Sequence, residues 1–187
     1  MLRHMRLRTL LLLCAASAVL SIAVPPAMAA AATSGVDDDV NAALKKLYAS
    51  EPVAKKIGAQ AKAVLVFPNI VKAGFIVGAQ YGEGALVQAG TIVGHYNSVA
   101  ASYGLQAGVQ AFGYALFLMN DQALAYLDQS DGWEIGVGPS IVIVNKGKAK
   151  SLTTTALKDD IYAFIFSQKG LMAGLGLQGS KITKISK

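Results

Sequence analysis

The chain contains few of the residues that most often carry out chemistry. Its 187 residues include one cysteine, Cys14, and two histidines, His4 and His95, while all three arginines lie within the first eight residues. A lone cysteine forms no disulfide within a chain. Beyond residue 29 the chain has only His95 and no cysteine, and one histidine without a thiolate cannot supply the usual ligands of a zinc site. The composition therefore predicts neither a disulfide framework nor a metal centre, and no cofactor is expected.

The amino terminus has the pattern of a secretory signal peptide. Three arginines precede an apolar run over residues 10–24, and two prolines and the small-x-small site Ala27-Met28-Ala29 follow it. We expect residues 1–29 to be removed and the protein to reach the periplasm or cell envelope. The run is shorter than the roughly 20 residues of a membrane span, which disfavours a transmembrane anchor. A further alternative is lipidation at Cys14, which would tether the chain to a membrane.

Cleavage would change the charge and limit the possible partners. The remaining chain has no arginine, and its 14 lysines against 11 acids leave a net charge of +3. Without arginine the protein lacks the side chain that binds phosphate and guanine in bidentate fashion. Nucleic acid is therefore not expected as a partner, and anions would be bound by lysines or backbone amides.

The rest of the sequence is predicted to form one domain. Residues 30–35 are small and polar, which is typical of a flexible leader, and residues 36–187 contain no internal linker. Their number is sufficient to bury a substantial core.

Helical spacing of apolar residues predicts three helices. The first covers residues 36–49, with Asp37, Asp38 and Asp39 expected in its first turn, where acids suit the helix dipole. The second covers 52–60 and begins at a proline. The third lies near 121–129 and can be capped by Asn120 or Asp121.

Most of the chain beyond residue 62 alternates with period two, as strands do. Glycines at 74, 78, 82 and 84 interrupt this pattern, which is typical of bulges, sharp bends or close backbone approach. The predicted fold class is α+β, with a predominantly antiparallel, strongly curved sheet that is sandwich-like or barrel-like. Residues 145–148 are a candidate hairpin turn. Strands are predicted at residues 63–67, 72–81, 84–89, 91–98, 101–111, 114–119, 133–144, 161–168, 171–177 and 181–185.

Four segments resemble the SYLF domain family, a family of lipid-binding modules also described as actin-binding in fungi. They read AKAVLVFPNIVKAGFIVGAQYGEG at 61–84, YGLQAG at 103–108, GWEIG at 132–136 and QKGLMAG at 168–174. The resemblance extends over about residues 40–187. It implies binding of phospholipid, since eukaryotic relatives bind phosphoinositides. Actin is not expected as a partner here, because the chain carries an export signal and none of the adaptor modules of many eukaryotic relatives.

Candidate catalytic residues are few. His95 has no carboxylate or serine motif beside it in the sequence, so a structural or solvent-facing role is favoured over a catalytic one. Glu83 belongs to the Tyr-Gly-Glu-Gly unit of the resemblance and is expected to be buried or bonded to backbone amides at a hairpin bend. The alternative is a hydrolase assembled from His95, Glu83 and either Ser98 or Ser102.

Two further motifs lack the context that their chemistry requires. The three acids Asp37, Asp38 and Asp39 are not part of a spaced calcium loop. The sequence Gly174 to Gly179 matches the dinucleotide pattern G-x-G-x-x-G, but too few residues follow it for the helix and second strand that this motif needs. We interpret the glycines as kinks in a strand.

Lysines are concentrated near the amino end of the predicted domain. Between residues 45 and 72 there are six lysines and one acid, Glu51, giving +5 against +3 for the chain beyond residue 29. A charge run is usually a solvated surface, but a basic helical surface beside an apolar stripe also suits anionic headgroups. The candidate lipid-binding residues are Lys45, Lys46, Lys55, Lys56 and Lys72.

The sequence therefore predicts a noncatalytic phospholipid-binding module of the cell envelope, which engages anionic headgroups through lysines of the first helices while an apolar pocket or sheet face accepts an acyl chain. The alternatives are an envelope protein that binds another protein or has a structural role, and a hydrolase that uses His95.

Overall fold

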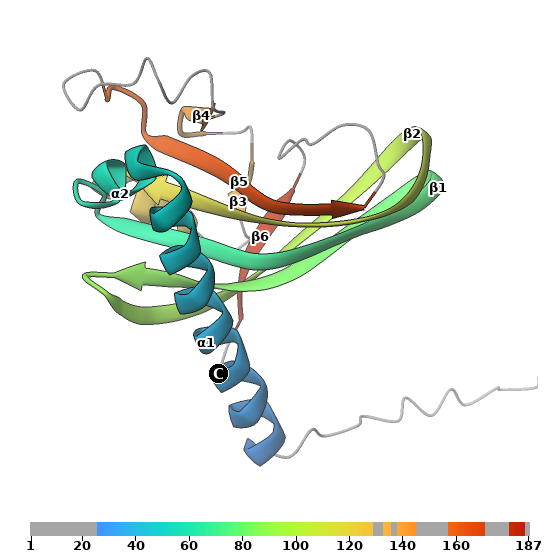
Figure 1. The fold of residues 1–187 in the computed structure, drawn as a ribbon, viewed down its shortest axis with the longest axis horizontal. Coiled ribbons are helices and arrows are strands. Elements are labelled where there is room, and N and C mark those ends of the chain that lie inside the picture. Colours follow the sequence, from blue (N-terminus) through green and yellow to red (C-terminus); the bar gives the residue numbers. More distant parts are fainter. Residues whose placement is uncertain (1–25, 129–132, 136–137, 145–156, 171–179, 186–187) are drawn as a thin grey trace, which may run out of the picture.

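Two long antiparallel strands dominate the fold (Figure 1). The structure is a computed structural model that describes residues 26–128, 133–135, 138–144, 157–170 and 180–185. Three helices and six strands in this part of the chain form the predicted α+β fold, with a curved, mostly antiparallel sheet. The elements are α1 (Pro26–Ser50), α2 (Pro52–Gly58), β1 (Ala63–Gln88), β2 (Thr91–Leu118), α3 (Asp121–Leu127), β3 (Trp133–Glu134), β4 (Ile141–Val144), β5 (Ile161–Gly170) and β6 (Lys181–Ile185).

Strands β1 and β2 replace six shorter predicted strands. They pair from Ala63 with Leu118 to Gln88 with Thr91, and the register shifts at three places along the ribbon. The prediction of separate strands was wrong because a glycine or proline inside a strand weakens pairing without ending it. The register shifts take up the irregularities as bulges, one of them between Phe75 and Val77.

The glycines of β1 allow the ribbon to bend back on itself. A Cβ atom on Gly74 would lie 2.3 Å from the Cα atom of Gly78, and one on Gly84 would lie 2.2 Å from the carbonyl oxygen of Val66. Real Cβ atoms do not come this close, so only glycine fits where the two halves of β1 meet. The predicted bend and close approach are therefore confirmed. We call the segment around Gly74 and Gly78, with its β2 partners, the bend.

The remaining strands line the other edge of β2. The strand order is β3-β6-β2-β5-β4, with β1 on the opposite edge of β2. Two strands, β3 and β4, lie where one strand was predicted over 133–144. Among the described residues the sheet does not close on itself. β4 and β5 pair in parallel, so they are not the arms of a hairpin. The candidate turn at 145–148 and the predicted strand at 171–177 lie outside the described residues.

Two hydrophobic cores lie on the two faces of the curved sheet. The inner core includes Phe67, Leu86 and Tyr114 and is closed by Ala123 and Leu127 of α3. The outer core lies beneath α1 and α2, and its largest fully buried side chains include Leu47, Ile57 and Phe117. Side chains of a strand alternate between faces, so β1 and β2 supply both cores.

Helix α1 begins ten residues before its predicted start. Its first turns extend past the sheet (Figure 1) and include an alanine-rich stretch, and alanine has the highest helix propensity. Residues 37–39 consequently lie inside the helix, and the first turn holds no acid, so their predicted contact with the helix dipole was wrong. The signal peptide at 1–29 and the leader at 30–35 stay predictions.

The other two helices begin where the sequence predicts. α2 starts at Pro52, and α3 is capped by the Asn120 side chain, which accepts a hydrogen bond of 2.8 Å from the Ala123 amide. None of the described helices is long and apolar enough to cross a membrane.

Candidate functional site

A shallow cavity of about 440 Å³ opens where α1 faces α2. Its α1 residues recur at intervals of three and four positions, so they belong to one face of the helix. Lys55 lines the cavity from α2. The lining residues are Asn41, Leu44, Lys45, Tyr48, Ala49 and Lys55.

The cavity combines an apolar floor with a basic rim. Leu44 and Tyr48 pack against the outer core, and burial raises the pKa of the Tyr48 hydroxyl, which stays neutral. The Tyr48 ring fits closely over α2, because a Cβ atom on Gly58 would lie 2.3 Å from the Tyr48 hydroxyl. The ammonium groups of Lys45 and Lys55 lie on exposed side chains at this opening. An anion with an apolar tail matches such a combination.

The structure brings some of the predicted lysines together. Lys45 and Lys55 line the same cavity, and Lys46 and Lys56 are exposed on the same two helices. Lys72 is half-buried on β1 and does not line the cavity. Their contact with lipid stays a prediction.

His95 has a structural partner that the sequence did not reveal. Its Nε2 donates a hydrogen bond of 2.6 Å to Asp37 Oδ1, and only 4% of the histidine is exposed. The pair joins α1 to β2. Since helix and strand are 58 residues apart in sequence, no local motif announces this contact.

The residues considered for a hydrolase do not assemble. His95 and Ser98 are three positions apart on β2, so they point to opposite faces of the sheet. Ser98 is fully buried and accepts a hydrogen bond of 2.8 Å from the Tyr114 hydroxyl, while the histidine is bonded to Asp37. The side chain of Ser102 lies outside the described residues.

Glu83 also differs from its predicted role. It is exposed in the middle of β1 opposite Asn97, and its Oε1 accepts a hydrogen bond of 2.5 Å from the Tyr81 hydroxyl. This hydrogen bond, more than burial, raises the pKa of Tyr81 to about 12. The prediction of a buried acid at a hairpin turn was wrong, because β1 continues to Gln88 before it turns.

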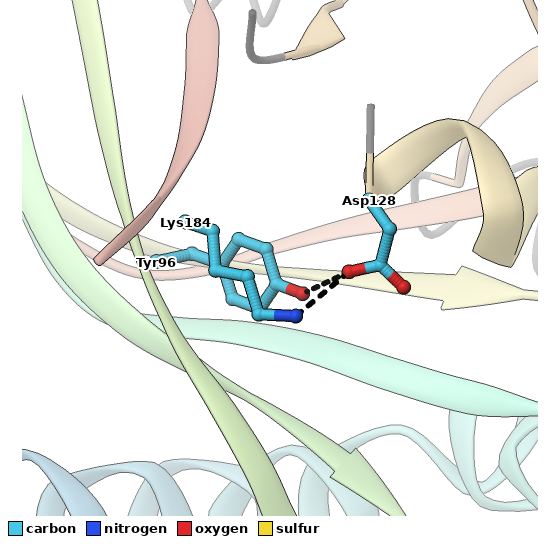
Figure 2. A network of polar contacts seen from close by, with 3 residues as sticks. All are labelled: Tyr96, Asp128 and Lys184. Carbon is cyan, nitrogen blue, oxygen red and sulfur yellow. Dashed lines mark hydrogen bonds and ion pairs between the residues drawn. The ribbon is translucent and has the colours of Figure 1, made fainter. Parts of the chain in front are cut away.

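A second polar cluster joins α3 to the sheet (Figure 2). Asp128 accepts hydrogen bonds from the Tyr96 hydroxyl at 3.3 Å and from Lys184 Nζ at 2.9 Å, and the lysine lies 6.0 Å from the centre of the tyrosine ring. Burial and the Asp128 carboxylate both raise the pKa of Tyr96, which disfavours its phenolate. A catalytic tyrosine base would need the opposite shift, so we assign the cluster a structural role.

The sequence did not show where an exposed apolar face of the sheet lies. Val71, Phe75, Val77 and Tyr81 of β1 are all exposed, although their alternation is typical of a buried strand face. The alternation was visible in the sequence, but it does not show which face is covered.

The described residues include no group of three or more His, Cys, Asp or Glu side chains that could hold a metal ion. The cavity with its apolar floor and basic rim, on an open α+β scaffold, is characteristic of a module that binds a ligand.

A family model described as "Ysc84: Las17-binding protein actin regulator" matches residues 99–187. The match covers most of β2 and all later elements, which is just under half of the chain. This match agrees with the predicted resemblance to the SYLF domain family. No curated protein matches the chain. Helices α1 and α2, with the lysine-rimmed cavity, lie outside the matched residues.

Proposed function

We propose that the protein is a noncatalytic phospholipid-binding module of the cell envelope. Anionic headgroups bind to the rim formed by Lys45 and Lys55, and the adjoining acyl chain contacts the apolar floor around Leu44 and Tyr48. The single observation that carries the proposal is the placement of two lysines from two helices around one apolar opening.

The charges near the cavity favour this ligand. Exposed Lys46 and Lys56 lie on the same helices and raise the local positive potential. Lys62, by contrast, is paired with Asp121 at 3.3 Å and contributes less. Each lysine close to an anionic membrane stabilises binding by about 1 kcal/mol, and salt screens this effect.

Export is part of the proposal, because an envelope protein meets phospholipid from outside the cytoplasm. The pattern at residues 1–29 supports it. Mass spectrometry of the protein recovered from an envelope fraction tests this point. Cleavage predicts a chain that begins at Ala30, whereas an unprocessed chain in the cytoplasm would contradict export.

Flotation with vesicles tests the lipid ligand. Wild-type protein is expected to float with phosphatidylglycerol vesicles at low salt and to remain behind with phosphatidylcholine vesicles. The double variant Lys45→Gln/Lys55→Gln should lose about 2 kcal/mol of binding free energy, roughly thirtyfold in affinity. The control is Lys158→Gln, which removes one positive charge, as each of the single variants Lys45→Gln and Lys55→Gln does. A double control that adds Lys169→Gln is less suitable, because Lys169 lies beside the ribbon.

Equal binding of the cavity variants and the Lys158 variant would remove the cavity from the proposal. Equal recovery of wild type with anionic and neutral vesicles would remove anionic lipid as the ligand. Crosslinking in intact cells that captures one stoichiometric protein partner, in the absence of any vesicle binding, would instead support the alternative of a protein-binding module.

A further inference from the structure

The bend of the β1–β2 ribbon presents an apolar face that no described element covers. Its most exposed large side chain is Phe75, at 75%, followed by Val109 at 61% and Val77 at 54%. Val71, Tyr81 and Val99 are also exposed. In Figure 1 this end of the ribbon lies far from α1 and α2. The face is therefore a surface distinct from the lysine-rimmed cavity.

The same sheet face is covered elsewhere in the molecule. Strand register places Val71 with Ala111 and, farther along, Val66 with Ala115, so these residues lie on one continuous face of the β1–β2 ribbon. Val66 and Ala115 belong to the outer core beneath the helices. Beyond them the helices end, but the apolar pattern continues through Ala73, Phe75 and Val77. A contiguous exposed apolar face of this kind indicates a binding surface.

Lysines border this face on two sides. Val71, Ala111 and Lys169 form one row across three strands, and Tyr81, Val99 and Lys181 form another. Paired residues of neighbouring strands project to the same face, so each row places an exposed lysine beside the apolar centre. Glu83 lies on the same face, and its carboxylate is bonded to the Tyr81 hydroxyl.

We propose that the bend inserts into the hydrocarbon region of an anionic membrane, with Phe75 and Val77 entering the acyl chains. Lys169 and Lys181 bind headgroups at the border, since long lysine side chains reach from apolar surface to a charged interface. Tyr81 lies at the level where aromatic residues with a polar group concentrate in membranes. The insertion shares its partner class with the proposed function, but it does not depend on the cavity.

The chemistry of the face favours lipid over a protein. Between Val71 and Tyr81, the outward side chains of β1 that the structure describes are Val, Ala, Phe, Val, Ala and Tyr. The only polar atom they offer is the tyrosine hydroxyl, whereas specific protein interfaces carry about one hydrogen bond per 100–200 Å². Backbone groups along β1 and β2 are already paired with each other. Acyl chains require no hydrogen bonds.

Fluorescence measures the insertion directly. The chain has a single tryptophan, Trp133, so the wild-type protein gives the background signal. Phe75→Trp should be quenched by vesicles of phosphatidylglycerol with brominated acyl chains, beyond the quenching of wild type. Gln88→Trp, which places the probe at the exposed turn between β1 and β2, is the control and should stay at the background. No added quenching of Phe75→Trp on bound vesicles would overturn insertion.

Affinity gives a second measurement. Val77→Ser should weaken vesicle binding roughly tenfold at high salt, where insertion of apolar side chains dominates. Val93→Ser is the matched control, because Val93 is equally a half-exposed valine but lies near the β1–β2 turn. The thermal midpoints of both variants should equal that of wild type. Equal vesicle binding by the two variants would contradict the proposal.

The outcomes also separate this inference from the proposed function. Unchanged vesicle binding by the Lys45→Gln/Lys55→Gln variant, with quenching of Phe75→Trp retained, would remove the cavity from the proposed function and leave insertion of the bend supported. Val77→Ser that abolishes concentration-dependent self-association in sedimentation, with no effect on vesicles, would assign the face to a second copy of the chain and overturn the inference.

Discussion

At the scale of single residues, the hydrogen bond between buried His95 and half-buried Asp37 attaches α1 to the sheet. Their hydrogen bond of 2.6 Å is the polar contact that positions the helix above β2. His95→Ala is expected to lower the free energy of unfolding by about 1–3 kcal/mol, because it removes a charge-assisted hydrogen bond and buried side-chain contacts. Urea denaturation measures the change. Asp38→Asn, an exposed neighbour of Asp37, should change it by less than about 0.5 kcal/mol.

Equal stability of the His95 and Asp38 variants would show that the pair does not hold the helix. A combined variant, His95→Ala with Asp37→Asn, tests whether the two residues act together. Its loss should be smaller than the sum of the two single losses, because both single changes break the same hydrogen bond.

Asp160 gives a residue-scale prediction of pH dependence. Its Oδ1 accepts a hydrogen bond of 2.6 Å from Asn120, and its Oδ2 accepts two of 2.8 Å from the Ser140 amide and hydroxyl. The Asn120 bond first, and then the Ser140 bonds, hold the pKa of this carboxyl below its ordinary value. A carboxyl with a lowered folded-state pKa stabilises the fold above its unfolded pKa and loses this effect as the pH falls through the folded value.

Asp160→Asn should therefore lower the thermal midpoint at neutral pH, and the difference from wild type should shrink on acidification. Midpoints recorded by circular dichroism between neutral and strongly acidic pH measure this. A difference that stays constant with pH would contradict a role for the ionised carboxylate. Asp39→Asn, at an exposed position of α1, is the matched control for the loss of one negative charge.

The residue-level hypotheses from sequence had mixed outcomes for a physical reason. Sequence neighbours of His95 indicated a structural role, and the residue is indeed buried and bonded within the fold. Its partner, Asp37, was assigned to a helix end, because contacts over 58 positions leave no local signal. Glu83 was placed at a turn because the flanking glycines resemble turn residues, whereas the backbone there continues as a strand.

At the scale of elements, the bend of β1 depends on glycine. A Cβ atom on Gly74 would lie 2.3 Å from the Gly78 Cα atom and 2.6 Å from the Val77 carbonyl oxygen. Both neighbours are backbone atoms, which cannot move aside as a flexible side chain can. Gly74→Ala is therefore expected to destabilise the fold by about 1–3 kcal/mol through overpacking.

The matched control for this change is Ala73→Val, which adds atoms to the next residue on the exposed face. Its effect should stay within about 0.5 kcal/mol. Denaturant unfolding of the two variants tests the prediction. A Gly74→Ala protein as stable as wild type would show that the ribbon reaches its bent shape without the glycine contact.

Element type was predicted better than element length. Helices α2 and α3 begin at the predicted residues, because proline and an asparagine cap are local signals. Strand continuity was not predictable, because pairing with β2 carries β1 through its glycines and bulges. The short parallel pair of β4 and β5 depends on partners that are far apart in sequence. Local pattern therefore determined the curvature correctly but not the connection between strands.

At the scale of the whole molecule, a folded-back ribbon separates two surfaces. The lysine-rimmed cavity lies with α1 and α2, and the apolar bend lies at the far end of the ribbon (Figure 1). The cluster of lysines near the amino end was predictable from charge alone, and the structure places two of them around one opening. The apolar face required knowledge of where the helices stop, which the sequence pattern did not contain.

The separation predicts that salt distinguishes the contributions of the two surfaces to vesicle binding. The Lys45→Gln/Lys55→Gln variant keeps the apolar bend, so its remaining binding to phosphatidylglycerol vesicles should fall less steeply with salt than that of wild type. The Val77→Ser variant keeps every lysine, so its remaining binding should fall with salt as steeply as that of wild type. Flotation at a series of salt concentrations gives both slopes. Since the residues changed share no contacts, the losses should add in free energy when the variants are combined. If the vesicle affinity of both variants falls equally steeply with salt, the cavity does not supply the electrostatic part of binding and the bend the apolar part, and the prediction is wrong.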